Sequence, residues 1–184
     1  GNQIALNVHC RPGDSIIAEQ ESHCFYYEAG ASAALSGVQF DFVPYSSKWN
    51  MNDVRMLLRD QSIHSATTSL VVLENTHNRG GGRVLDVAKV AEISSWAKEQ
   101  GLSVHCDGAR LWNAASALGV QEKELVSSLD SVSVCFSKGL GAPVGSALVG
   151  DASFIARARK VRKRWGCGMR QAGMLAAGVL YALD

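Results

Sequence analysis

Short apolar runs alternate with longer amphipathic segments along the chain, and this alternation predicts the fold. Runs typical of β-strands cover Ser15–Ala18, Val38–Val43, Leu70–Leu73, Leu102–Cys106, Val132–Phe136 and Val144–Val149. Helical patterns cover Glu28–Leu35, a segment that opens at Asn52, Asp86–Gly101, Arg110–Leu118 and Ala172–Leu183. Because strands that alternate with helices form parallel units, we predict an α/β fold of three layers, in which helices flank a mainly parallel sheet.

The last two predicted strands differ from the others in how they are connected. Phe136 and Val144 are separated by a glycine-rich loop that is too short to hold a crossover helix. A parallel connection needs such a helix, so Val144–Val149 is predicted to run antiparallel to its predecessor. The sheet is therefore expected to contain one antiparallel strand.

Composition and charge indicate a globular domain and argue against several classes of protein. Of the 184 residues, 47% are hydrophobic, which is enough for one domain with a core. Charged residues make up 19% and the net charge is +1, so neither a general nucleic-acid binder nor a polybasic membrane protein is expected. No apolar run reaches the roughly 18 residues that span a bilayer.

The five cysteines are odd in number and widely spaced, and none belongs to a Cys-x-x-Cys pair. This pattern argues against both a zinc site and a disulfide framework. Cys106 and Cys135 fall in or beside apolar runs, where a free thiol behaves as a small hydrophobic side chain. Free thiols are typical of a reducing compartment, so we expect a cytoplasmic protein.

The two ends of the chain lead to an expectation about its domain organisation. The chain starts at Gly1 without an initiator Met, and no charged leader precedes an apolar stretch, so no signal peptide is expected. It ends at Asp184 within a helical pattern. We expect a single domain over residues 1–184 that is truncated at both ends.

Polar residues that could carry chemistry follow three of the predicted strands. His77, Asp107 and Lys138 each come shortly after one of these strands. In open α/β sheets, ligands bind at the carboxyl ends of the strands. Because such ends meet at one edge of a parallel sheet, the three side chains can converge on one pocket.

Lys138 stands at a junction that favours a nucleophilic amine. It follows the apolar run Val132–Phe136 and precedes Gly139 and Gly141. A lysine in this position is expected to be partly desolvated, which makes its amine a usable nucleophile. The glycines allow a bulky ligand to approach the backbone. The alternative is a lysine that extends into solvent from a strand end.

Asp107 also allows more than one interpretation. A buried carboxylate at a strand end needs a positive partner, and either a pyridinium nitrogen or Arg110 would serve. Asp107 could instead cap the helix that begins near Arg110. His105 lies on the same strand face, but two ligands do not make a metal site, and no metal is predicted.

Other motifs argue against familiar classes of site. Gly139–Gly145 has the wrong glycine spacing for a dinucleotide loop and is followed by a strand. No Gly-x-Ser-x-Gly elbow is present, so an acyl-transfer hydrolase is not expected. The basic segment Arg157–Trp165 is interpreted as a solvated helix face, with phosphate, subunit or nucleic-acid contacts as alternatives.

Four motifs follow one another along the chain: Leu73–Asn78, His105–Arg110, Ser137–Gly145 and Gly166–Gln171. In order and spacing they resemble the low-specificity threonine aldolases, which are fold-type-I enzymes that use pyridoxal 5'-phosphate. The resemblance spans nearly the whole chain. It implies the large, cofactor-binding domain of the aspartate aminotransferase fold.

The resemblance also implies roles for individual residues. Lys138 would carry the cofactor as an internal aldimine, and Asp107 would pair with the pyridine nitrogen and keep it protonated. His23 matches the histidine that stacks on the ring, and Arg110 matches an arginine near the cofactor and the substrate carboxylate. His64 matches a second histidine near the substrate hydroxyl. From position alone, both histidines would be surface or cap residues.

The chain also departs from the family pattern. Gly1 and Asn2 match the end of a phosphate-binding segment whose threonine is absent here, and Ser137 stands beside Lys138 among the expected cofactor contacts. The family's small C-terminal domain and its carboxylate-binding arginine are absent, and Cys167 stands where the family usually has glycine. These departures allow a chain that binds the cofactor weakly or does not turn over.

The resemblance therefore implies a carbon–carbon lyase that cleaves threonine and allo-threonine to glycine and acetaldehyde, in threonine catabolism and glycine biosynthesis. The expected partners are an amino-acid substrate and further copies of the chain, in a homodimer or homotetramer. No nucleic acid or membrane is expected as a partner. Two alternatives stay open: another fold-type-I lyase or aminotransferase, and an inactive homologue that serves as a structural subunit.

Overall fold

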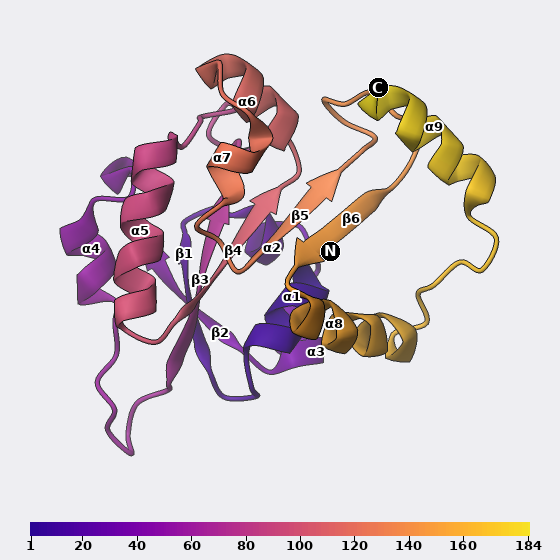
Figure 1. Ribbon diagram of the computed structural model, residues 1–184. Coiled ribbons are helices and arrows are strands. Elements are labelled where there is room, and N and C mark those ends of the chain that lie inside the picture. Colours follow the sequence, from indigo (N-terminus) through magenta and orange to yellow (C-terminus); the bar gives the residue numbers. More distant parts are fainter.

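A six-stranded sheet runs through the centre of the computed structural model, which describes residues 1–184 (Figure 1). In spatial order the strands are β2 (Gln39–Val43), β1 (Ser15–Glu19), β3 (Thr68–Glu74), β4 (Ser103–Gly108), β5 (Ser131–Cys135) and β6 (Ser146–Gly150). The first five are parallel, and β6 pairs with β5 in the antiparallel direction. The predicted strand pattern and the single antiparallel strand are therefore confirmed.

Helices cover both faces of the sheet and complete the three predicted layers (Figure 1). One face packs against α4 (Met51–Met56), α5 (Val87–Glu99), α6 (Leu111–Leu118) and α7 (Glu122–Val126). The other face packs against α1 (Asn2–His9), α2 (His23–Tyr26), α3 (Ala31–Ser36) and α8 (Ala152–Arg164). A short 3-10 turn, η1 (Tyr45–Ser47), and the last helix, α9 (Gly173–Leu183), complete the chain.

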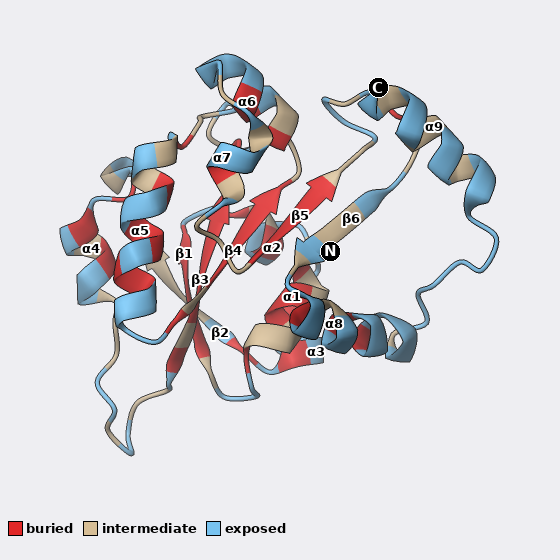
Figure 2. Ribbon diagram, in the orientation of Figure 1, coloured by how far each residue is buried: buried red, intermediate tan, exposed pale blue.

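The central strand β3 is apolar from Leu70 to Leu73 because both of its faces are buried (Figure 2). On β3, Val71 and Leu73 belong to the core under α4–α7, whereas Leu70 and Val72 face the opposite layer. Successive side chains of a strand point to opposite faces, so a continuous apolar run fills both cores. This is why Leu70–Leu73 shows no alternation in the sequence.

The residues at helix ends correctly predict some helix boundaries but not others. Asp86 caps α5 as predicted, since its side chain accepts a hydrogen bond from the Lys89 backbone N–H. The helix predicted from Glu28 begins only at Ala31, because Ala29 and Gly30 have φ of 52° and 69°. Helix α1 was not predicted, and Gly1 at its start offers no side chain for capping.

The last helix differs from the others in having no buried residue. In Figure 1 it stands apart from the sheet, at the end of a long connection from α8. Its contact with the rest of the chain includes Gly178, where an added Cβ would lie 3.0 Å from the ring of Pro143. None of the helices combines the length and the apolar character needed to cross a membrane.

Candidate functional site

A cavity of about 110 Å³ lies at the carboxyl ends of β4 and β5. Its walls come from the start of α1, from α2 and the loop after it, and from β4–β6 with their connecting loops. The lining residues are Gly1, Asn2, His23, Glu28, Asp107, Ala109, Ser133, Cys135, Lys138 and Ser146. Five of the residues predicted for the cofactor site, Gly1, Asn2, His23, Asp107 and Lys138, therefore meet at one place.

Asp107 is buried near the end of β4 and has only neutral hydrogen-bond donors. Its side chain is 3% exposed, and Oδ2 accepts a hydrogen bond from Asn2 Nδ2 at 2.8 Å. Oδ1 accepts one from the Ala109 backbone N–H at 3.1 Å. The residue that precedes α6 is Arg110, so Asp107 does not cap that helix. No ion pair joins Asp107 to any cation of the chain, and a cationic ligand in the cavity would compensate its charge.

Gly108 allows the end of β4 to lie close against β5. A Cβ on Gly108 would come within 2.8 Å of Val132 Cγ2 and 3.0 Å of the Ser133 carbonyl oxygen. Both distances are too short for carbon packing, so only glycine permits this approach. The position of Asp107 in the cavity wall therefore depends on its neighbour in the sequence.

Lys138 lies in the loop between β5 and β6 and is exposed. The expected partial desolvation of this lysine is therefore wrong for the chain by itself, because the loop leaves the side chain open to solvent. The loop lies close to α6 at Gly139, where an added Cβ would be 1.9 Å from Asn113 Oδ1. Glycine at this position lets the loop hold the amine at the rim of the cavity.

His23 begins α2 and presents its ring to the same cavity. Its backbone N–H donates to Glu74 Oε2 at 2.8 Å, and its Nε2 lies 3.8 Å from Glu28 Oε1. Burial raises the pKa of Glu74, which also accepts a hydrogen bond from the Asn78 backbone. Glu74, at the end of β3, is thus hydrogen-bonded to the first residue of α2.

His77 does not line this cavity, contrary to the expected convergence of three strand ends. It is 1% exposed, and its Nδ1 accepts a hydrogen bond from the Gly80 backbone N–H at 3.0 Å. Its Nε2 lies 3.5 Å from Glu19 and 3.9 Å from Glu74, and burial lowers its pKa. His77 thus stabilises the loop between β3 and α5 through its hydrogen bond with Gly80.

His64 also does not line this cavity, and its expected contact with the substrate stays a prediction. It is exposed in the loop between α4 and β3, which extends from the lower edge of the sheet in Figure 1. This loop leads into the amino end of β3, whereas Asp107 lies at the carboxyl end of the parallel strand β4. The two ends of parallel strands are opposite edges of a sheet, so His64 and Asp107 lie at opposite edges.

Two further predicted residues adjoin the cavity without lining it. Arg110 is half-buried and follows Ala109, and Ser137 is exposed and precedes Lys138. Their expected contacts with cofactor and substrate stay predictions.

Glu28 and Ser133 were not predicted for the site, and they share a hydrogen-bond partner in the cavity wall. Asn2 donates to Glu28 Oε1 at 3.0 Å, and its Oδ1 accepts a hydrogen bond from the Ser133 hydroxyl. One signal was available in the sequence: on β5, serines alternate with valines and indicate one polar face. That face could not be assigned a partner, because Asn2 and Ser133 are 131 positions apart.

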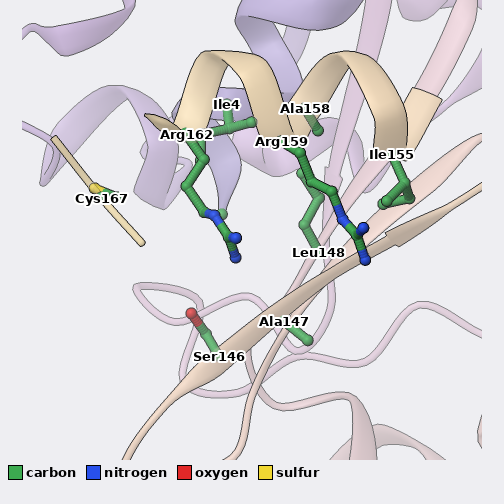
Figure 3. A pocket seen from close by; sticks show the side chains of 10 residues that line it. Ile4, Ser146, Ala147, Leu148, Ile155, Ala158, Arg159, Arg162 and Cys167 are labelled. Atoms are coloured by element: carbon green, nitrogen blue, oxygen red, sulfur yellow. The ribbon is translucent and has the colours of Figure 1, made fainter. Parts of the chain in front are cut away.

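A second cavity, of about 430 Å³, adjoins the first and shares Gly1 and Ser146 with it (Figure 3). Arg159 and Arg162 extend into it from α8, above an apolar floor that includes Leu148. Neither arginine forms an ion pair within the chain. The cavity is larger, but it contains no carboxylate, imidazole or lysine, so we place the chemistry in the smaller one.

The chain resembles known proteins and solved structures along nearly its whole length. It is 44% identical over 189 residues to low-specificity L-threonine aldolase 1 of Arabidopsis thaliana, covering 100% of this chain and 53% of that protein. It is 42% identical over 184 residues to the low specificity L-threonine aldolase of Escherichia coli K12, covering 99% of this chain and 54% of that protein. The solved structure of Leishmania major threonine aldolase superposes on this chain with a TM-score of 0.86 at 27% identity. The superposition covers 99% of this chain and 53% of the Leishmania chain.

The chain thus spans about half the length of the curated relatives that it matches. The sequence profile of the beta-eliminating lyase family matches all of residues 1–184. With the fold and the identities above, this match shows that the chain belongs to the beta-eliminating lyase family.

Proposed function

We propose that this chain is the cofactor-binding part of an aldolase that cleaves threonine and allo-threonine to glycine and acetaldehyde with pyridoxal phosphate. One observation carries the proposal: a primary amine, a buried carboxylate without a cation, and an imidazole line the same cavity. The relatives named threonine aldolases support the choice of reaction. The resemblance stated above supports the choice of cofactor.

The residues of the cavity have the chemistry that this cofactor needs. Lys138 offers the only lysine amine in the lining, which suits covalent attachment to an aldehyde. Asp107 is a buried anion whose hydrogen bonds come from neutral groups, which suits a protonated pyridine nitrogen. Gly1 and Asn2, at the start of α1, would hold the phosphate with backbone N–H groups.

When bound, pyridoxal phosphate supplies the electron sink for breaking the Cα–Cβ bond of the substrate. His23 is the imidazole in the lining and therefore the group that can accept the proton of the substrate β-hydroxyl. Glu28, whose Oε1 lies 3.8 Å from His23 Nε2, would stabilise the imidazolium that results. The Lys138 amine, at the rim of the same cavity, could hold the proton that the carbon destined to become the glycine Cα needs.

The attachment at Lys138 is tested by adding pyridoxal phosphate to the purified chain and reducing the product with borohydride. We expect a new visible absorbance band, a stable adduct after reduction, and its location on the peptide that contains Lys138. Lys138→Ala should lose the adduct. Lys98→Ala is the matched control, because Lys98 is also exposed but donates to the Ser128 carbonyl, far from the cavity in sequence and fold. An adduct that persists in Lys138→Ala would refute the assignment.

The family name itself points to a second reaction, β-elimination. Threonine would then yield 2-oxobutanoate and ammonia in place of glycine and acetaldehyde. Product analysis with threonine separates the two reactions, and 2-oxobutanoate as the main product would reject aldol cleavage. A chain that binds the cofactor but forms neither product would support the alternative of a non-catalytic subunit.

A further inference from the structure

A chain of hydrogen-bonded side chains runs through the layer between α1 and the sheet and ends at Asp107. His9 Nε2 lies 2.8 Å from Ser131 Oγ, which in turn lies 2.8 Å from His105 Nδ1. His105 Nε2 lies 3.3 Å from Asn2 Oδ1, and Asn2 Nδ2 donates to Asp107 Oδ2 at 2.8 Å. The reaction proposed above assigns no role to His9, Ser131 or His105.

The fold brings these residues together through strand register. His105 is paired with Ser131, and Asp107 with Ser133, across the parallel strands β4 and β5. Paired residues of neighbouring strands point to the same face, so all four polar side chains face α1. Helix α1 contributes the two other members of the hydrogen-bond chain, Asn2 from its first turn and His9 from its last.

The direction of each hydrogen bond follows from the chemistry of Asn2. Its Nδ2 faces carboxylate oxygens of Asp107 and Glu28, which can only accept when ionised, so this atom is the amide nitrogen. Its Oδ1 is then an acceptor, and His105 must carry its proton on Nε2 in order to donate to it.

The two histidines are neutral, so each carries one ring proton. Burial lowers the pKa of His105 to about 3 and that of His9 to about 4. With its proton on Nε2, neutral His105 accepts the Ser131 hydroxyl proton at Nδ1. Ser131 can then accept from His9 Nε2–H. Every donor in the chain therefore points toward Asp107.

We propose that His105 and Asn2 are positioning residues, which orient the Asp107 carboxylate toward the cavity through a hydrogen-bond chain of one direction. Asn2 holds Oδ2 while the Ala109 backbone holds Oδ1, so rotation of the carboxylate is restrained at both oxygens. His105 acts only through Asn2, whose amide it keeps in the orientation that donates to Asp107. The role in cofactor binding rests on the proposed function, whereas the direction of the hydrogen bonds from His9 to Asp107 does not.

The direction is tested without cofactor by nitrogen-15 NMR of the imidazole rings. We expect His105 to be neutral at pH 7, with its proton on Nε2. Asn2→Leu removes the acceptor and should produce a mixture of the two neutral forms. A proton on Nδ1 in the unmodified chain would overturn the proposal, because Asn2 Oδ1 would then face a nitrogen that cannot donate.

The positioning role is tested by replacing His105 and measuring the affinity for pyridoxal phosphate by absorbance. His105→Leu loses the donor to Asn2 and should weaken binding about tenfold, as expected for one buried hydrogen bond. His105→Gln can still donate through its amide and should retain affinity within about threefold, the smaller loss reflecting imperfect geometry.

The matched control separates positioning from loss of stability. Val104→Ala creates a cavity on the same strand but on the opposite face, so it should lower stability without changing affinity. Affinity of His105→Leu equal to that of the unmodified chain would overturn the proposal, as would an equal loss in Val104→Ala. Failure of the unmodified chain to bind pyridoxal phosphate would instead reject the proposed function, and the NMR result would still decide the direction of the hydrogen-bond chain.

Discussion

At the scale of single residues, burial without a charged partner distinguishes the groups that define the site. Asp107 is 3% exposed and accepts only from an amide and a backbone N–H. The other deeply buried carboxylates are bound locally: Glu19 is paired with Arg83, and Glu74 accepts two backbone N–H groups. Asp107 is thus the buried carboxylate that faces a cavity, and this position suits it to a cationic ligand.

The two neutral histidines make the fold sensitive to acid. In the unfolded chain both titrate near the ordinary pKa of 6.5, but in the folded chain their pKa values lie at about 4 for His9 and about 3 for His105. As pH falls below 6.5, the unfolded chain binds protons that the folded chain excludes, so stability decreases. Each histidine contributes at most about 1.4 kcal/mol per pH unit within its own window.

We therefore expect the urea midpoint to fall as pH is lowered from 6.5 toward 4, with a shallower decline in His105→Gln. Carboxylates also titrate in this range, so the comparison is between the slopes of the two proteins. His64→Gln is the control, because His64 is exposed, and its slope should match that of the unmodified chain. Equal slopes in all three proteins would contradict this expectation, because they would show that His105 takes up its proton as readily in the folded chain as in the unfolded one.

At the scale of secondary-structure elements, the end of β4 controls the site. Its polar residues His105 and Asp107 face α1, and Val104 and Cys106 face the core under α5–α7. The close approach of β4 to β5 at Gly108 sets the distance between Asp107 and the loop that carries Lys138. The sequence predicted both strands but not this approach, because glycine is equally compatible with an ordinary turn.

Gly108→Ala should therefore disturb both stability and the site. The new Cβ would lie 2.8 Å from Val132 Cγ2, and we expect overpacking to cost about 1–3 kcal/mol of unfolding free energy. Affinity for pyridoxal phosphate should fall as well, since Asp107 is the adjacent residue. Gly173→Ala is the control: nothing lies within 4 Å of its added Cβ, and stability should change by less than about 1 kcal/mol. Unfolding curves in urea measure both variants, and equal stability of the two would contradict the packing argument.

At the scale of the whole molecule, the first helix belongs to the core, whereas the last one does not. Helix α1 is packed between the sheet and its neighbours α3 and α8, and it supplies Asn2 to the cavity. Helix α9 buries no residue and exposes Met174 and Tyr181 almost completely. These apolar side chains therefore lie on a helix that contributes no buried side chain to the core.

A chain that ends at Trp165 should therefore fold as stably as the full one. Removing residues 166–184 deletes no buried side chain, and we expect a change in unfolding free energy below about 0.5 kcal/mol. Phe154→Ala is the contrasting variant, since Phe154 is buried between α8 and α1 and its loss should cost about 3–5 kcal/mol. A loss above about 2 kcal/mol on truncation would contradict the description of α9. Sedimentation of both chains would also test the expected homo-oligomer.

The sequence alone determined the strands, their mainly parallel order and the antiparallel last strand, because these depend on local periodicity and loop length. It also singled out Lys138 and Asp107 as candidates, since strand-end position is itself a local property, and both line the same cavity. Only the tertiary structure decided which residues meet. It excluded His64 and His77 from the cavity and added Glu28, Ser133 and the hydrogen-bond chain from His9. These outcomes depend on contacts between residues up to 131 positions apart, which no local pattern of side chains encodes.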